Sequence, residues 1–195
     1  MKETIKKCKV EWCDQNVHSK DLCSRHYHIW NKCGYGGGVY KIYIKDKIYI
    51  GKSDMSLHHR KKDELSALRN NNKSLPKALS EYFNEICLEE LGEEYLNPEL
   101  RQTIIDKFVT VVTLEEMFPF LEEKGEEGNK DIRREMVFNW YSRYKDDQMD
   151  EVTTYWYELW HEKIDSAETR EINKHYRLDI ENGTNNLLNK NKVRK

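Results

Sequence analysis

Cysteine and histidine crowd the first 33 residues of the chain, and this cluster constrains the fold more than any other feature. Four of the five cysteines lie there. Cys8 and Cys13 form one close pair, and Cys23 and His26 form a second pair, one helical turn apart. Two close pairs separated by a loop are typical of a tetrahedral zinc site. A segment of about thirty residues cannot bury a core of its own, so a bound metal would supply much of its folding free energy.

We therefore expect a zinc-binding module over residues 1–34, with these four side chains as ligands. Cys33 and His28 are possible substitute ligands, and unrelated buried thiols are the alternative interpretation. No apolar run approaches the length of a membrane span, and the first residues lack the apolar core of a signal peptide. These features predict a cytoplasmic protein, in which a reducing environment favours metal binding over disulfides.

The stretch GGGVYKIYIKDKIYIGKS, from Gly36 to Ser53, raises the question of a nucleotide phosphate loop. That loop requires a glycine five residues before its Gly-Lys-Ser triplet, where this chain has Asp46. The stretch instead holds two runs of β-branched and aromatic residues joined by a polar turn, which predicts a β-hairpin. The glycine-rich residues 34–38 are a flexible joint, so we place the domain boundary there.

Residues 35–195 predict one α+β domain, a small three-stranded antiparallel sheet flanked by helices. Leucine spacing predicts a helix after the hairpin, and Ser74 is the expected cap of a second helix. The valine-rich stretch 106–116 predicts the third strand. A helix capped by Ser166 and an Asn-Gly turn at Asn182 complete the domain.

Residues 116–164 predict a helical insertion in this domain, crowded with tryptophan and tyrosine. These aromatics could pack the insertion onto the core or form a platform on which bases stack. We favour packing, because the insertion is acidic.

The charge distribution favours a polyanionic partner at both ends of the chain. The formal net charge is only −2, but residues 1–80 hold 17 Lys and Arg against 8 Asp and Glu. Residues 81–195 hold 16 against 27, although the last thirty residues are again positive, 7 against 4. Basic ends with an acidic middle suit contact with nucleic acid, while solvated charged faces are the simpler interpretation.

Several motifs, taken in order, resemble the GIY-YIG nuclease family. Gly38-Val39-Tyr40 stands where the family has Gly-Ile-Tyr, and Tyr49-Ile50-Gly51 stands for its second triplet. Arg60 follows on the next helix, then Ala167-Glu168 with Ile172 one turn on, then Asn182-Gly183-Thr184-Asn185. The resemblance covers about residues 37–114 and 163–190. Separately, the Cys8–Trp30 stretch looks like the zinc modules of phage-type homing endonucleases.

The resemblance implies a metal-dependent DNA endonuclease of the homing type, acting on double-stranded DNA in a bacterial cell or a phage-infected host. Six basic side chains of the first module would then contact backbone phosphates: Lys2, Lys6, Lys7, Lys9, Lys20 and Arg25. Tyr40 would be the general base or orient the water, with Tyr49 beside it. Arg60 would hold the scissile phosphate, and Glu168 would bind Mg²⁺. Lys41 or Lys52 could favour the tyrosine phenolate. Asn185 could position the glutamate or the hairpin. Glu135 is the second candidate for the metal position.

Two departures from the family pattern keep other functions open. Glu64 stands where homing members often have a histidine, and Lys73 replaces a second histidine. Arg60 could simply form an ion pair with Glu64 on a solvent-exposed face. Glu168 could simply supply negative charge that stabilises the first turn of a helix. The alternatives are a restriction-type endonuclease and a non-catalytic DNA-binding or adaptor protein with a decayed nuclease fold. The oligomeric state stays open between a monomer and a transient dimer on DNA.

Overall fold

The computed structural model describes residues 6–117 and 130–189. The chain divides into two compact units. The N-terminal unit comprises Met1–Gly36 and Phe118–Trp160, and the sheet unit comprises Gly37–Met117 and His161–Lys195. One long helix, α7 (Glu151–Asn182), contributes to both. Among the described helices, none has both the length and the apolarity needed to cross a membrane.

The sheet unit is built on three antiparallel strands in the order β2-β1-β3. Strands β1 (Gly37–Ile44) and β2 (Lys47–Ser53) form the predicted hairpin, and β3 (Val109–Met117) pairs with the other edge of β1. Lys45 closes the hairpin turn with a φ of 49°, in the left-handed region. The predicted α+β class with a small three-stranded antiparallel sheet is confirmed.

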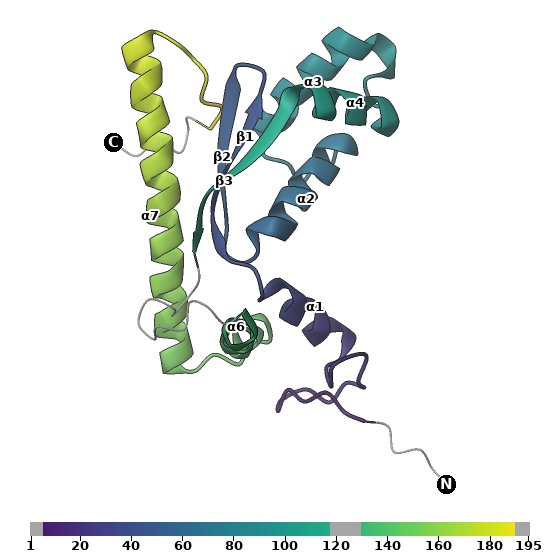
Figure 1. Ribbon diagram of the computed structural model, residues 1–195, viewed down its shortest axis with the longest axis vertical. Helices are drawn as coiled ribbons and strands as arrows, with labels where there is room; N and C mark the ends of the chain where they lie inside the picture. Colours follow the sequence, from purple (N-terminus) through teal and green to yellow (C-terminus); the bar gives the residue numbers. More distant parts are fainter. Residues whose placement is uncertain (1–5, 118–129, 190–195) are drawn as a thin grey trace. The chain divides into compact units, whose positions relative to one another are not determined.

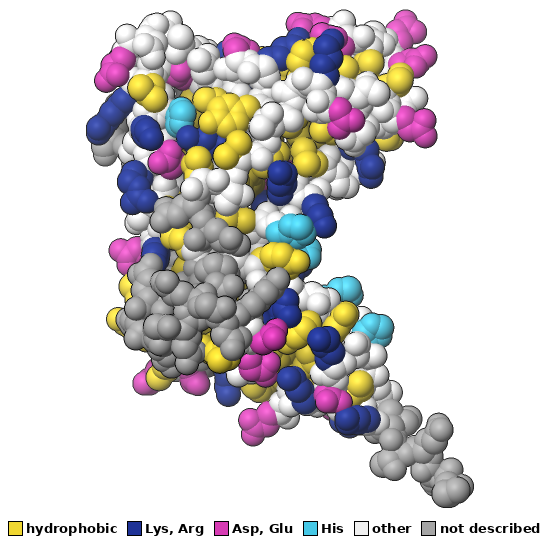
Figure 2. Space-filling model, in the orientation of Figure 1, with side chains coloured by type: hydrophobic (Ala, Val, Ile, Leu, Met, Phe, Trp, Pro, Cys, Tyr) yellow, Lys and Arg dark blue, Asp and Glu magenta, His cyan; other side chains and the backbone are white. Residues whose placement is uncertain are grey.

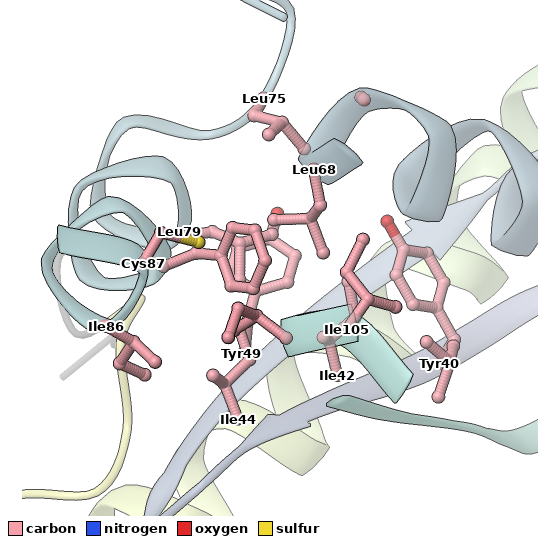
Figure 3. Packing of buried hydrophobic residues seen from close by; sticks show 14 of the residues in the cluster. Tyr40, Ile42, Ile44, Tyr49, Leu68, Leu75, Leu79, Ile86, Cys87 and Ile105 are labelled. Atoms are coloured by element: carbon pink, nitrogen blue, oxygen red, sulfur yellow. The ribbon is translucent and has the colours of Figure 1, made fainter. Parts of the chain in front are cut away.

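Strand alternation gives the sheet two different faces. Tyr40, Ile42 and Tyr49 point to one face, where they join a buried cluster with three helices (Figure 3). Those helices are α2 (Leu57–Arg69), α3 (Lys77–Leu91) and α4 (Pro98–Phe108), with the short 3-10 helix η1 (Gly92–Glu94) between the last two. On the opposite face, α7 runs beside the sheet (Figure 1), and buried Lys41 lies 3.4 Å from Glu171 of that helix.

Three element boundaries in the sheet unit differ from the sequence prediction. The helix predicted from Ser74 begins at Lys77, because Pro76 disfavours helical backbone in the residue before it. Residues 98–108 form α4, capped by the Asn97 side chain, so the third strand begins only at Val109. The helix predicted from Ser166 is the last part of α7, which contains no glycine or proline to interrupt it.

The N-terminal unit joins α1 (Ser24–Lys32) to α6 (Lys130–Lys145) and the start of α7. The sequence analysis placed the insertion of residues 116–164 in the domain of residues 35–195, and by contact Phe118–Trp160 groups with Met1–Gly36. The reason is aromatic packing: buried Phe138 of α6 lies edge-on to His26 of α1, with ring centroids 6.2 Å apart. Trp140 and Trp160 are also buried.

Candidate active site and metal site

The two tyrosines of the motif triplets lie on the same face of the hairpin. Tyr40 of β1 is only 2% exposed, and its register partner on β2 is Gly51. A Cβ atom built at Gly51 would lie 2.5 Å from both Cζ and Oη of Tyr40. The glycine of the second triplet therefore makes room for the tyrosine ring of the first. Tyr49 is likewise buried, two residues before this glycine.

The hydroxyl group of Tyr40 joins a hydrogen-bonded triangle with two side chains of α2. It donates to Oε1 of Glu64 at 2.8 Å and accepts from Nε of Arg60 at 3.2 Å. Arg60 Nη2 also lies 2.6 Å from Glu64 Oε1, and Figure 3 shows the Tyr40 hydroxyl directed toward the helix. Glu64 is 3% exposed, whereas the Arg60 side chain keeps 42% of its surface open. The Arg60–Glu64 pair thus exists, but it is half buried and not on a solvated face.

Burial sets the protonation of both tyrosines. It raises the pKa of Tyr40 far above its ordinary value, and the charge of Glu64 adds to this, while Arg60 opposes it. Burial also raises the pKa of Tyr49, with further contributions from Glu64 and Glu168. Both phenols are therefore protonated at neutral pH, and Tyr40 uses its proton to bind Glu64.

The carboxylate of Glu168 lies on the buried side of α7. The residue is 7% exposed, and its charge contributes to the raised pKa of Tyr49. Two lysines expected near the tyrosine phenolate pair instead with α7: Lys52 with Asp165, and Lys41 with Glu171. Ion pairs thus link α7 to both strands of the hairpin.

Glu135, the second candidate for the metal position, belongs to the N-terminal unit. It is exposed on α6, where its carboxylate lies 3.3 Å from the Lys9 ammonium group. Tyr40, Tyr49, Arg60 and Glu168 all belong to the sheet unit.

The C-terminal asparagines attach the chain to the outer edge of the hairpin. Asn185 is exposed, and its carbonyl oxygen accepts a hydrogen bond from Lys47 at 2.8 Å. Asn189 is buried, and its side-chain amide pairs with both the N–H and the C=O of Ile50. Sequence analysis singled out Asn185 and missed Asn189, because nothing in the local pattern separates one asparagine of this segment from the next.

The four predicted metal ligands come together in the N-terminal unit. One ligand atom from each of Cys8, Cys13, Cys23 and His26 lies within 4.8 Å of the other three. His26 Nδ1 is 3.4 Å from Cys8 Sγ and 3.3 Å from Cys23 Sγ. A tetrahedral ion with bonds of about 2.3 Å separates its donors by roughly 3.8 Å, so the cluster could hold a metal such as zinc.

The thiols of Cys8 and Cys13 differ in pKa. Burial alone would raise the pKa of Cys8, but hydrogen bonds from Val10, Cys23, His26 and Cys13 bring it down to about 7. Burial, together with the neighbouring Cys23 and Cys8, raises the pKa of Cys13 to about 11, so Cys8 gives up its proton to a metal ion more readily than Cys13. The possible substitute Cys33 is fully buried, and burial raises its pKa to about 12.

The basic side chains expected to contact DNA phosphates all have protein partners, except that Lys2 lies outside the described residues. The pairs are Lys6 with Asp21, Lys7 with the Asp14 carbonyl, Lys9 with Glu135, Lys20 with the Trp30 ring, and Arg25 with Asp146. Figure 2 shows basic and acidic side chains intermingled on the visible face. The Lys6–Asp21 and Lys9–Glu135 pairs are exposed on both sides, and exposed pairs are weak, so phosphate groups could replace these two acidic partners.

No protein-family model, curated protein or solved structure matches this chain. The GIY-YIG assignment therefore stays a hypothesis that depends on the motif residues and on the geometry around them.

Proposed function

We propose that the chain is a metal-dependent DNA endonuclease of the GIY-YIG homing type, with an N-terminal zinc module. The observation that supports this most is the triangle of Tyr40, Arg60 and Glu64, in which the tyrosine of the first triplet meets the arginine of the following helix. A single tyrosine in a strand usually only packs against its neighbours, whereas the Tyr40 hydroxyl also binds a buried carboxylate and a guanidinium group.

Arg60 would bind the scissile phosphate of double-stranded DNA. Its Nε is engaged by Tyr40, and the open part of its planar guanidinium group can donate to phosphate oxygens. Negative charge grows on those oxygens as the transition state forms, so a fixed cation there lowers the barrier.

Glu64 would complete a proton relay in place of the family's histidine. The raised pKa of Tyr40 rules out a stable phenolate, so the hydroxyl can accept a proton from water only as it passes its own to Glu64 Oε1. The resulting hydroxide attacks phosphorus, the bond to the leaving oxygen breaks, and that oxygen takes a proton from solvent. Glu64 then returns its proton to solvent.

Glu168 would serve a single Mg²⁺ site, because this ion commonly takes one or two carboxylates and fills its remaining positions with water and substrate phosphate. The buried Glu168 carboxylate, whose charge contributes to the raised pKa of Tyr49, would hold the ion, and a bound Mg²⁺ would supply positive charge for the leaving oxygen. Glu135 lies in the N-terminal unit, whereas both motif tyrosines, Tyr40 and Tyr49, lie in the sheet unit. With one such site per chain, cutting both strands needs two successive cuts or two copies.

A non-catalytic DNA-binding or adaptor protein is the second candidate function. It is favoured by the near-complete burial of Tyr40, whose hydroxyl is already hydrogen-bonded on two sides. A restriction-type enzyme would share the chemistry and differ in the length and symmetry of the sequence that it cuts.

Plasmid nicking separates these functions. The full chain, loaded with zinc, is incubated with supercoiled DNA with and without added Mg²⁺. We expect nicking that requires Mg²⁺ and is lost in Tyr40→Phe and Glu168→Gln. The matched controls Tyr43→Phe, on the same strand, and Glu135→Gln should keep the activity. Loss in Glu135→Gln instead of Glu168→Gln would reject the metal position proposed here, and binding without nicking on varied DNA would favour the adaptor.

A further inference from the structure

We infer that Asp146, at the end of α6, orients His26 for metal binding and thereby makes the insertion part of the metal site. This inference requires a metal on the four-ligand cluster, but it does not require the nuclease activity. Asp146 follows its histidine partner by 120 residues and belongs to no metal-ligand motif.

The two ring nitrogens of His26 have different partners. Nδ1 faces the thiols of Cys8 and Cys23, while Nε2 lies 2.6 Å from Oδ2 of Asp146. His26 is 1% exposed, so in the folded chain its Nε2 is paired with this carboxylate and not with bulk water. A carboxylate that accepts the Nε2 proton leaves the Nδ1 lone pair for the metal and fixes the ring orientation.

Asp146 is itself held by side chains of the N-terminal module. The indole N–H of Trp12 donates to its Oδ2 at 2.7 Å, and Arg25 Nη2 lies 2.6 Å from its Oδ1. Arg25 also donates to the carbonyl oxygen of Lys145, at the last residue of α6. Trp12, Arg25 and His26 all lie within residues 1–34, so these three partners of the carboxylate belong to the module that carries the ligands.

Other contacts also join α6 to α1. Phe138 packs edge-on to the His26 ring, and the Arg134 guanidinium lies 4.2 Å from the ring centroid of Trp30. Trp30 and His26 both lie on α1, so α6 covers the helix that supplies one metal ligand. Packing alone would hold the insertion in place without any effect on the metal, and metal affinity therefore distinguishes the two roles.

Coupling between the insertion and the metal must be reciprocal. If docking of Asp146 strengthens metal binding, the bound metal stabilises the docked α6 by the same free energy. We expect removal of the metal to loosen α6 in the N-terminal unit while α3 of the sheet unit keeps its stability.

The first test measures zinc affinity of the full chain by competition with a chromophoric chelator. Loss of such a partner typically weakens metal binding about 10–100-fold, and we expect this for Asp146→Ala. Asp146→Asn keeps an oxygen that can accept the Nε2 proton, so its loss should be smaller. The matched control is Asp147→Asn, which removes the same charge from the exposed neighbouring residue. The absorption spectrum of bound Co²⁺ reports whether the ligands themselves are retained.

The second test follows hydrogen exchange in α6 with and without zinc. Wild type should exchange more slowly with zinc, and this zinc-dependent protection should shrink in both Asp146 variants. The inference would be overturned if the zinc affinity were equal in Asp146→Ala, Asp146→Asn and Asp147→Asn. It would also be overturned if hydrogen exchange in wild-type α6 were the same with and without zinc. If the wild-type chain binds no zinc, the proposed metal site is rejected as well. Plasmid nicking tests the proposed nuclease function independently of these results.

Discussion

Substitution of Gly51 by alanine tests whether this glycine is required by the Tyr40 ring. The added Cβ would lie 2.5 Å from Cζ and Oη of Tyr40. The ring has little freedom to move, because Glu64 and Arg60 hold its hydroxyl and the side chain is 2% exposed. Overpacking costs about 1–3 kcal/mol, and replacing a strand glycine by alanine returns about 0.5–1 kcal/mol. The difference of these two ranges is about 0–2.5 kcal/mol, and the 2.5 Å contacts place the expected destabilisation of the sheet unit in its upper half.

Guanidinium unfolding followed by far-UV circular dichroism measures this loss, and a double-mutant cycle identifies its cause. All five tryptophans lie in the N-terminal unit, so tryptophan fluorescence reports that unit and should not change in Gly51→Ala. In a Tyr40→Ala background the clash is absent, and Gly51→Ala should become neutral or stabilising. The coupling free energy should then be about 1–3 kcal/mol. An equal cost of Gly51→Ala in both backgrounds would refute the steric reasoning.

Three further predictions follow from the polar contacts. Glu64→Gln should lower the nicking rate by about 100-fold with little change in DNA affinity, because the substitution removes the proton acceptor of Tyr40. An unchanged nicking rate in single-turnover assays would contradict the proton relay. Zinc removal should shift the tryptophan fluorescence, since Trp12 binds Asp146 and Trp30 contacts Arg134, while hydrogen exchange of β1 stays constant. Arg101→Ala should destabilise the sheet unit by about 3–5 kcal/mol, because buried Arg101 donates to the carbonyl oxygens of Leu68 and Tyr95 and to the Asn84 side chain. Arg101→Lys keeps the charge, so chemical denaturation should show a smaller loss of stability for this variant.

Features that depend on nearby residues could be predicted from the sequence. The hairpin was predicted because two β-rich runs flank a short polar turn, and the structure pairs them as expected. The ligand cluster was predicted because its four members lie within 19 residues in two close pairs, and the structure brings them together. In both cases local geometry leaves few alternatives. Helix limits were less predictable, since α3 begins at Lys77 and α7 extends back to Glu151.

Contacts between distant segments were decided only by the tertiary structure. Glu64 was a departure from the family pattern in the sequence, but packing of α2 on the sheet places it against the hydroxyl of Tyr40. Asp146 was one acidic residue among many in an acidic insertion, yet it meets His26, and Asn189 meets Ile50 from 139 residues away. A polar side chain can satisfy its hydrogen bonds with many partners, and its local sequence is compatible with all of them. Burial by the assembled helices and strands removes water and selects one partner, so these pairs exist only in the folded chain.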